Sequence, residues 1–215
     1  MPVVVITGAS QGLGEAIAVA FAAKYGRTAR LALVARSGTS LARVADACRQ
    51  RQAAAEAFVC DVTDDAAVEA MAADVQARLG AADVLVNNAG RFTPGGLAAT
   101  TPAAFREMVE VNLTSAFLVS RAFLPAMLAR GTGRVLMMGS VASVKGYPGG
   151  LAYGAAKHGL LGLARALRED TRGSGVDEAR LMPAADVARV AVEIAGLSGR
   201  TVVEEVLLRP DAGDL

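Results

Sequence analysis

The stretch Val3-Val-Val-Ile-Thr-Gly-Ala-Ser-Gln-Gly-Leu-Gly14 decides the fold of this chain. Its first five residues are apolar or β-branched, which predicts a short buried strand. The glycines that follow predict a tight turn, and the alanine-rich residues from Glu15 to about Tyr25 predict a helix. A glycine-rich turn that leads into a helix N-terminus is a favourable site for a diphosphate, because the backbone can approach the ligand and its N–H groups attract negative charge.

Strands and helices alternate along the rest of the chain. The predicted strands lie near residues 3–7, 30–35, 56–60, 83–87, 133–138 and 202–208. The predicted helices lie near residues 12–25, 39–53, 64–79, 102–129, 151–170 and 184–197. This alternation predicts one α/β domain, residues 1–215, with a doubly wound, Rossmann-like parallel sheet and helices on both faces. In such a fold, cofactor and substrate meet at the carboxyl ends of the strands.

Composition narrows the class of protein. Hydrophobic residues make up 53% of the chain and the net charge is +1, which favours a globular fold and gives no support for nucleic-acid binding. No apolar run approaches the roughly 20 residues of a membrane span, and the immediate start of the first strand leaves no room for a signal peptide. Cys48 and Cys60 lack metal-ligand spacing, so we expect no metal site and a reducing, cytoplasmic setting.

Tyr153 and Lys157 lie in one predicted helix, in the sequence Tyr153-Gly-Ala-Ala-Lys157, and Ser140 precedes them. Positions i and i+4 share a helix face, so this spacing sets a phenol beside an ammonium group. A free tyrosine titrates near pH ~10, and a nearby cation can lower such a pKa by about 1–3 units. A phenol tuned in this way can pass a proton to or from the oxygen of a carbonyl or an alcohol.

Taken together, these motifs resemble those of the short-chain dehydrogenase/reductase family, and the resemblance covers most of the chain. Thr7-Gly-Ala-Ser-Gln-Gly-Leu-Gly14 is similar to the family's T-G-x-x-x-G-x-G cofactor loop, and Asn87-Asn-Ala-Gly90 to its N-N-A-G motif. Asp61-Val62 is similar to the pair that meets the adenine. The residues that match the family's catalytic tetrad are Asn112, Ser140, Tyr153 and Lys157.

The resemblance implies an oxidoreductase that interconverts a carbonyl and a secondary alcohol by hydride transfer, with a small-molecule substrate. Tyr153 would be the acid or base, and Lys157 the cation beside it that also binds the nicotinamide ribose. Ser140 would polarise the substrate carbonyl, and Asn112 would hold a water that joins Lys157 to solvent. The implied cofactor contacts are Gly8, Ser10, Gln11, Gly12, Leu13, Gly14, Asp61, Val62, Asn88, Ala89, Gly90, Tyr153 and Lys157.

The end of the second predicted strand bears on the choice of cofactor. A carboxylate there would bind the adenosine ribose and select NAD, but this chain has Ala35 followed by Arg36. A guanidinium suits a 2′-phosphate, so we expect NADP(H) to be preferred over NAD. The family's NADP-dependent members resemble this pattern, although Gln11 stands where many of them carry a second basic residue.

The chain departs from the family after the helix that ends near Arg172. Members then have a further buried strand, a Pro-Gly pair and a lid over the substrate, whereas residues 171–182 contain no apolar strand and no Pro-Gly follows them. We therefore expect one strand to be missing before the last helix. Two explanations stay open: a true deletion, which would favour a catalytically silent nucleotide-binding homologue, or a stretch of chain that the sequence does not include.

Two long predicted helices bear on assembly. Family members commonly pair the helices that here span residues 102–129 and 151–170. The second contains leucines that cannot all face the sheet at a period of 3.6 residues, namely Leu160, Leu161, Leu163 and Leu167. An apolar patch left on the outer face would mark an interface, so we expect a homodimer or homotetramer.

Overall fold

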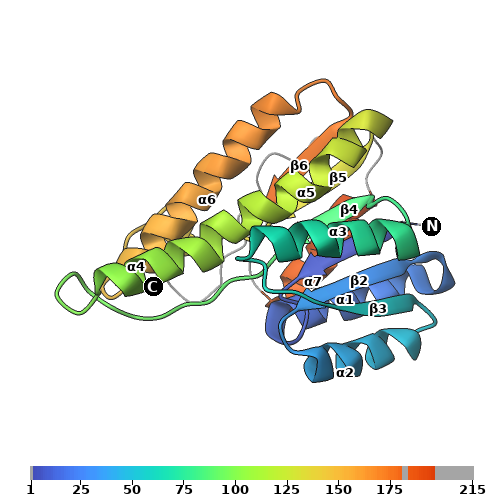
Figure 1. The fold of residues 1–215 in the computed structure, drawn as a ribbon, viewed down its shortest axis with the longest axis horizontal. Coiled ribbons are helices and arrows are strands. Elements are labelled where there is room, and N and C mark those ends of the chain that lie inside the picture. Colours follow the sequence, from blue (N-terminus) through green and yellow to red (C-terminus); the bar gives the residue numbers. More distant parts are fainter. Residues whose placement is uncertain (1, 181–183, 197–215) are drawn as a thin grey trace.

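Six parallel strands form one sheet in the computed structural model of the chain, which describes residues 2–180 and 184–196 (Figure 1). The strands are β1 (Val3–Thr7), β2 (Arg30–Ala35), β3 (Ala54–Val59), β4 (Val84–Asn87), β5 (Gly133–Met137) and β6 (Val176–Arg180). The helices are α1 (Gly12–Tyr25), α2 (Gly38–Arg49), α3 (Asp65–Leu79), α4 (Pro102–Val109), α5 (Ser115–Arg130), α6 (Leu151–Asp170) and α7 (Ala184–Ala195). The predicted α/β class and alternation are confirmed, while the predicted strand at 202–208 lies outside the described residues.

The strand order β3-β2-β1-β4-β5-β6 is that of a doubly wound sheet. The chain first builds outward from β1 to β3, and then returns to the other side of β1 with β4. The loops after β1 and β4 therefore leave the sheet in opposite directions. A crevice opens between them at the carboxyl ends of the strands, which is where such sheets bind ligands.

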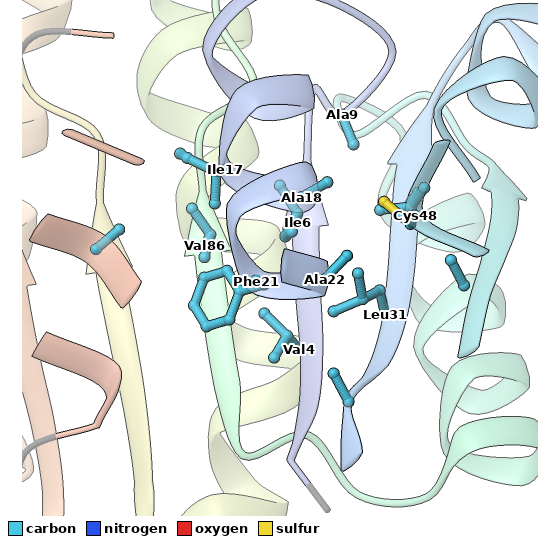
Figure 2. Packing of buried hydrophobic residues seen from close by; sticks show 14 of the residues in the cluster. Val4, Ile6, Ala9, Ile17, Ala18, Phe21, Ala22, Leu31, Cys48 and Val86 are labelled. Carbon is cyan, nitrogen blue, oxygen red and sulfur yellow. The ribbon is translucent and has the colours of Figure 1, made fainter. Parts of the chain in front are cut away.

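Both faces of the sheet are covered, and β1 lies in the middle of the core. Val4 and Ile6 pack against α1 residues, among them Ile17 and Phe21 (Figure 2). Val3, Val5 and their neighbours on the opposite face belong to a second cluster, to which α3, α5 and α6 contribute. A strand buried on both faces reads as a continuous apolar run, as the opening of this sequence does. The core thereby fixes the carboxyl end of β1, where the glycine-rich turn begins.

The expectation of a missing strand is wrong. Residues Val176–Arg180 form β6, which pairs in parallel with β5 in the register Gly133↔Val176 to Met137↔Arg180. At the edge of the described sheet, a strand is held by its backbone hydrogen bonds and does not need an apolar run. Gly173 and Gly175, with φ of 76° and 81°, form the turn that leads into it. The expected Pro-Gly pair and lid would follow β6, where residues 181–183 lie outside the described part of the chain.

The helices α4 and α5 are continuous, because a π-helical turn at Glu110–Thr114 joins them into one helix of 29 residues. By length and composition alone this helix could span a membrane, since the mean hydropathy of one 18-residue window is 1.4. However, α5 contributes Val119, Phe123 and Met127 to the core, where all three are buried. The apolar composition therefore matches the position of a core helix.

The leucines of α6 do not form the expected exposed patch. Leu160 and Leu161 are buried, and Leu163 and Leu167 are half-buried against the core cluster that includes α3 and α5. At a period of 3.6 residues they fall on one broad stripe, and the sheet and neighbouring helices are wide enough to cover it. The structural argument for assembly from these leucines is therefore wrong.

Candidate functional site

The loops that follow β1 and β4 are tied together at the crevice. The Thr7 hydroxyl accepts hydrogen bonds from the backbone N–H groups of Asn88 and Ala89, both at 3.0 Å, and donates to the Val86 carbonyl at 3.3 Å. The Asn88 side chain returns a hydrogen bond from Nδ2 to the Thr7 carbonyl at 2.9 Å. Two of the predicted motifs, far apart in the sequence, thus form one rigid unit at the carboxyl edge of the sheet.

Glycine is required in the turn between β1 and α1. Gly8 and Gly12 have φ of 65° and 58°, which other residues adopt only under strain. A Cβ on Gly14 would lie 2.6 Å from Asn88 Nδ2 and would overlap the Gly8 carbonyl. The helix α1 begins at Gly12, which lines the cavity, so the N-terminus of the helix lies at the crevice. These residues fit the diphosphate of a dinucleotide, which binds to backbone N–H groups at a helix N-terminus.

A cavity of about 860 Å³ occupies this crevice. The predicted cofactor residues that line it are Gly8, Ser10, Gln11, Gly12, Leu13, Arg36, Asp61, Val62, Asn88, Ala89 and Gly90. Three residues that were also predicted to contact the cofactor do not line it, namely Gly14, Tyr153 and Lys157. Gly14 serves close packing instead. Further lining residues, which sequence analysis did not assign, are Ala35, Ser37, Ser40, Cys60, Thr63, Arg91, Glu107, Glu110 and Val111. Cys60 directly follows β3, and Ser37 and Arg91 lie in the loops after β2 and β4. Glu107 reaches the cavity from α4, a relation that only the fold reveals.

Arg36 and Asp61 lie across the cavity mouth from one another. The Arg36 guanidinium is 4.0 Å from the Asp61 carboxylate, and 72% of the Arg36 side chain is exposed. Hydrogen bonds from the Thr63 backbone and hydroxyl, with a smaller contribution from Arg36, hold the pKa of Asp61 below its usual value. Ser37, which caps the N-terminus of α2, lines the same part of the cavity. Arg36 and this helix N-terminus offer positive potential to an anionic group.

Tyr153 and Lys157 share one face of α6, as the i, i+4 spacing predicts. The Lys157 ammonium lies 5.8 Å from the centre of the Tyr153 ring, and its side chain is buried. It donates a hydrogen bond to the Met138 carbonyl at 2.8 Å, just beyond the end of β5. A buried ammonium needs polar partners and projects its charge through a medium of low dielectric constant. The fold therefore provides a cation beside the phenol.

Ser140 lies in the loop after β5. It is the N-cap of a short 3₁₀ turn, where its hydroxyl oxygen accepts a hydrogen bond from the Ala142 N–H at 3.1 Å. The neighbouring Ser143 is fully buried and accepts a hydrogen bond from the Ser140 N–H. Because the Ser140 hydroxyl oxygen accepts a hydrogen bond from the backbone, the hydroxyl proton can still be donated to a ligand.

Asn112 lies in the π-helical turn and is buried. Its Nδ2 donates to the carbonyls of Arg91 and Met108 at 2.9 and 3.0 Å, and its Oδ1 accepts from the Arg91 N–H at 3.1 Å. A Cβ on Gly90 would meet Asn112 Oδ1 at 2.6 Å and Lys157 Nζ at 3.8 Å. The side chain thus holds the backbone beyond Gly90 beside Lys157, and π-helical turns often occur at such functional positions.

Two aromatic residues that sequence analysis missed lie beside Tyr153. The rings of Phe92 and Tyr153 meet edge to face with centres 5.1 Å apart, and those of Phe92 and Tyr147 lie 6.3 Å apart. Burial, with a smaller effect of the nearby Tyr153, raises the pKa of Tyr147, so this second phenol stays protonated at neutral pH. Both residues fall in loops without periodicity. Only the position of Phe92 just after Asn87-Asn-Ala-Gly90 could have suggested a role.

Arg43 is a further residue without a sequence signal. Its guanidinium pairs with both carboxylate oxygens of Glu15, at 2.6 and 2.7 Å, and donates to the Ser10 carbonyl at 3.3 Å. The hydrogen bonds from Arg43 lower the pKa of Glu15. The pair links α2 to the first turn of α1 and to the glycine-rich turn, so it supports one side of the cavity.

Cys48 and Cys60 are the two cysteines of the chain. Both are free and buried; burial raises the pKa of Cys48 to about 11 and also raises that of Cys60. Within residues 2–180 and 184–196, no three histidine, cysteine or carboxylate side chains are grouped as metal ligands.

Several known proteins are similar to this chain in sequence and in fold. The family model for short chain dehydrogenases matches residues 2–191. A ketoacyl reductase of the granaticin polyketide synthase from Streptomyces violaceoruber is 37% identical, over 81% of this chain and 64% of the relative. Sepiapterin reductase from Chlorobaculum tepidum is 30% identical, over 99% of this chain and 98% of the relative.

A solved structure gives the same result. A metagenomic short-chain oxidoreductase in complex with NADP superimposes with a TM-score of 0.90 and 35% identity, over 97% of each chain. The family model spans the glycine-rich turn, the residues after β4 and the α6 pair, all of which meet at one edge of the sheet. This chain therefore belongs to the short-chain dehydrogenase family.

Proposed function

We propose that this chain binds NADP(H) in the crevice and interconverts a small carbonyl compound and its secondary alcohol. One observation carries the proposal: a buried lysine stands beside a tyrosine on α6, and its ammonium lies close to Gly90, which lines the cavity of about 860 Å³. A phenol can act as an acid at neutral pH when a cation stabilises its anion, and a dinucleotide requires the close backbone approach that the glycines allow.

Each residue of the tetrad then has a chemical role. When bound, NADP(H) supplies or accepts the hydride. In the direction of reduction, Tyr153 donates its phenolic proton to the carbonyl oxygen, and in the direction of oxidation it takes this proton back. The buried charge of Lys157 stabilises the phenolate, and Ser140 donates a hydrogen bond to the same substrate oxygen. Asn112 positions the backbone of Arg91; that it also holds a water next to Lys157 stays a prediction.

The preference for NADP(H) rests on Arg36 and the residues around it. The exposed guanidinium and the capped N-terminus of α2 suit a 2′-phosphate, whereas no carboxylate occupies the end of β2 at Ala35. The solved short-chain oxidoreductase at a TM-score of 0.90 is a complex with NADP, which supports the same choice. The alternative of a silent homologue relied on a missing strand, and the presence of β6 removes that reason.

Replacing Tyr153 by Phe tests the proposed activity. The parent protein is assayed with NADPH against a panel of small ketones and aldehydes by the loss of NADPH absorbance. We expect the Tyr153→Phe variant to bind NADPH as the parent does, while turnover falls by a factor of about 10² or more. Tyr25→Phe is the matched control, since Tyr25 stacks on Phe21 in the helix α1. A parent protein that binds NADPH but reduces nothing in the panel would support the silent homologue instead.

Assembly into a homodimer or homotetramer is also part of the proposal. Although the leucines of α6 are covered, large apolar side chains on the same helices are partly exposed, namely Phe105, Phe117, Leu128 and Leu151. Exposed apolar groups of this size favour an interface between copies. Light scattering at micromolar concentration tests this, and a strictly monomeric mass contradicts it.

The reducing, cytoplasmic setting stays a prediction that the two free thiols support.

A further inference from the structure

Three aromatic rings, including that of the candidate acid Tyr153, lie together in a chain that has few of them. The chain contains three tyrosines, six phenylalanines and no tryptophan. Phe92 lies between Tyr153 and Tyr147, in contact range of both. Half of Phe92 is exposed, at 51%, although it lies beside the candidate acid. An exposed phenyl group at this point offers apolar surface to whatever binds against Tyr153.

The two segments that carry these rings are fastened to each other. The Gly95 N–H donates to the Gly149 carbonyl at 2.8 Å, and the Leu151 N–H donates to the Gly95 carbonyl at 3.4 Å. A Cβ on Gly150 would lie 2.7 Å from ring atoms of Tyr147, so this glycine packs directly against the ring. The loop after β4 and the turn before α6 therefore form one joined support for the aromatic side chains.

Phe92 is also anchored from its other side. Asn112 holds both the N–H and the carbonyl of Arg91. Phe92 thus stands directly between the backbone hydrogen bonds of residue 91 and those of residue 95. A segment whose backbone is anchored on both sides in this way loses little backbone conformational entropy when a ligand packs on it.

We propose that Phe92 and Tyr147 form an aromatic wall of the substrate site, which selects ketones whose carbonyl is attached to a planar aromatic ring. This inference rests on the proposed carbonyl reduction. Aromatic pairs favour offset or edge-to-face contacts with centres about 4.5–7 Å apart, the range that the rings of the wall already adopt among themselves. A planar aromatic ring beside the carbonyl can join this arrangement. A saturated ring is thicker and lacks the quadrupole that gives an aromatic ring its positive edge and negative face. Tyr147, as a neutral phenol, adds no charge to the wall.

Two ketones of the same carbon skeleton separate aromatic character from size. Acetophenone and cyclohexyl methyl ketone differ only in the saturation of the ring. The measured quantity is the ratio of their kcat/KM values with NADPH, compared between parent and variants. Because the intrinsic reactivities of the two ketones cancel in this comparison, only contacts with the protein change the ratio.

We expect Phe92→Leu to lower the ratio of acetophenone to cyclohexyl methyl ketone by about ten-fold, the scale of aromatic pairing. Leucine keeps an apolar side chain at a half-exposed position, so folding and NADPH affinity stay unchanged. Gly150→Ala displaces the Tyr147 ring and lowers the ratio in the same direction. Phe105→Leu is the matched control: it replaces a partly exposed phenylalanine of α4 and leaves the ratio unchanged.

The outcomes separate this inference from the proposed function. If the parent reduces both ketones and Phe92→Leu leaves the ratio unchanged, the aromatic wall is overturned while carbonyl reduction stands. If Phe105→Leu lowers the ratio as much as Phe92→Leu, the effect is general and the wall is likewise overturned. A parent that reduces neither ketone overturns the selection for aryl ketones, and the carbonyl panel with Tyr153→Phe then decides the activity by itself.

Discussion

The cofactor side and the catalytic side of the crevice are built from different parts of the chain. On the cofactor side, the loops after β1 and β4 are joined by hydrogen bonds between side chains and backbone, made by the Thr7 hydroxyl and the Asn88 amide, and Gly14 leaves room for this contact. At the α6 end, the roles proposed for Tyr153 and Lys157 belong to their side chains, and Lys157 donates a hydrogen bond to the Met138 carbonyl of another segment. The glycines of the cofactor side belong to a local motif, whereas the partners of Lys157 and Asn112 come from segments that only the fold brings close.

This difference predicts that the cofactor side tolerates no added atoms, and that the catalytic side is sensitive to lost contacts. Four substitutions test the two halves separately. Each is paired with a control of the same chemistry elsewhere in the described chain.

Gly14→Ala should have the largest effect. The added methyl group would lie 2.6 Å from Asn88 Nδ2, so the turn and the residues after β4 must move apart. We expect the Kd for NADPH to rise by about 100-fold or more, equivalent to about 3 kcal/mol of strain and lost contacts. Fluorescence titration with NADPH measures this. Gly162→Ala is the control, since a Cβ at this exposed helical position meets nothing within 4 Å. Equal affinity of both variants would refute a site built from close backbone approach.

Asn112→Ala tests the catalytic side. Loss of the amide releases the backbone of Arg91 beside the tetrad, and a small misplacement of reacting groups can cost a factor of about 10² in rate. We expect kcat to fall by about ten- to hundred-fold, while the Kd for NADPH changes far less. Ser115→Ala removes a hydrogen bond to the Val111 carbonyl in the same region and serves as the control. Parallel losses of kcat and NADPH affinity would mean that the two sides are not separable.

Arg36→Ala should have an intermediate effect, confined to one cofactor. A charged hydrogen bond contributes about 1.5–3 kcal/mol, so the Kd for NADPH should rise by roughly ten-fold or more and that for NADH should barely change. Arg51→Ala, in the turn just after α2, is the control. A parent protein that binds NADPH and NADH equally well would contradict the role given to Arg36.

The smallest effect is expected at the contact between Glu15 and Arg43. Because the pKa of Glu15 is lowered in the folded protein, its stabilising contribution is present above the pKa of the unfolded chain. The contribution is lost as the pH falls through the pKa that Glu15 has in the folded protein. Glu15→Gln should therefore have a slightly lower Tm than the parent at neutral pH, and this difference should disappear in acid once Glu15 is protonated in the folded protein as well. A Tm difference that persists in acid would show that charge is not the cause. Glu69→Gln is a control on the exposed face of α3.

The sequence by itself determined the fold class and the components of the cofactor side. The apolar run Val3-Val-Val-Ile-Thr7 and the glycines after it specify a strand and a turn locally, since buried strands need apolar residues and positive φ favours glycine. The helical spacing of Tyr153 and Lys157 likewise follows from local geometry. These features were readable because each depends on neighbours within a few residues.

Only the tertiary structure decided which polar or irregular segments take part in the sheet and in the candidate site. The segment Val176–Arg180 becomes a strand because β5 offers it a ladder of backbone partners, although its sequence has no strand pattern. The π-helical turn at Asn112, the contact of Arg43 with Glu15 and the meeting of Phe92 with Tyr147 are equally invisible in the sequence. The pairings of Arg43 with Glu15 and of Phe92 with Tyr147 join groups that are distant along the chain and become neighbours only in the fold.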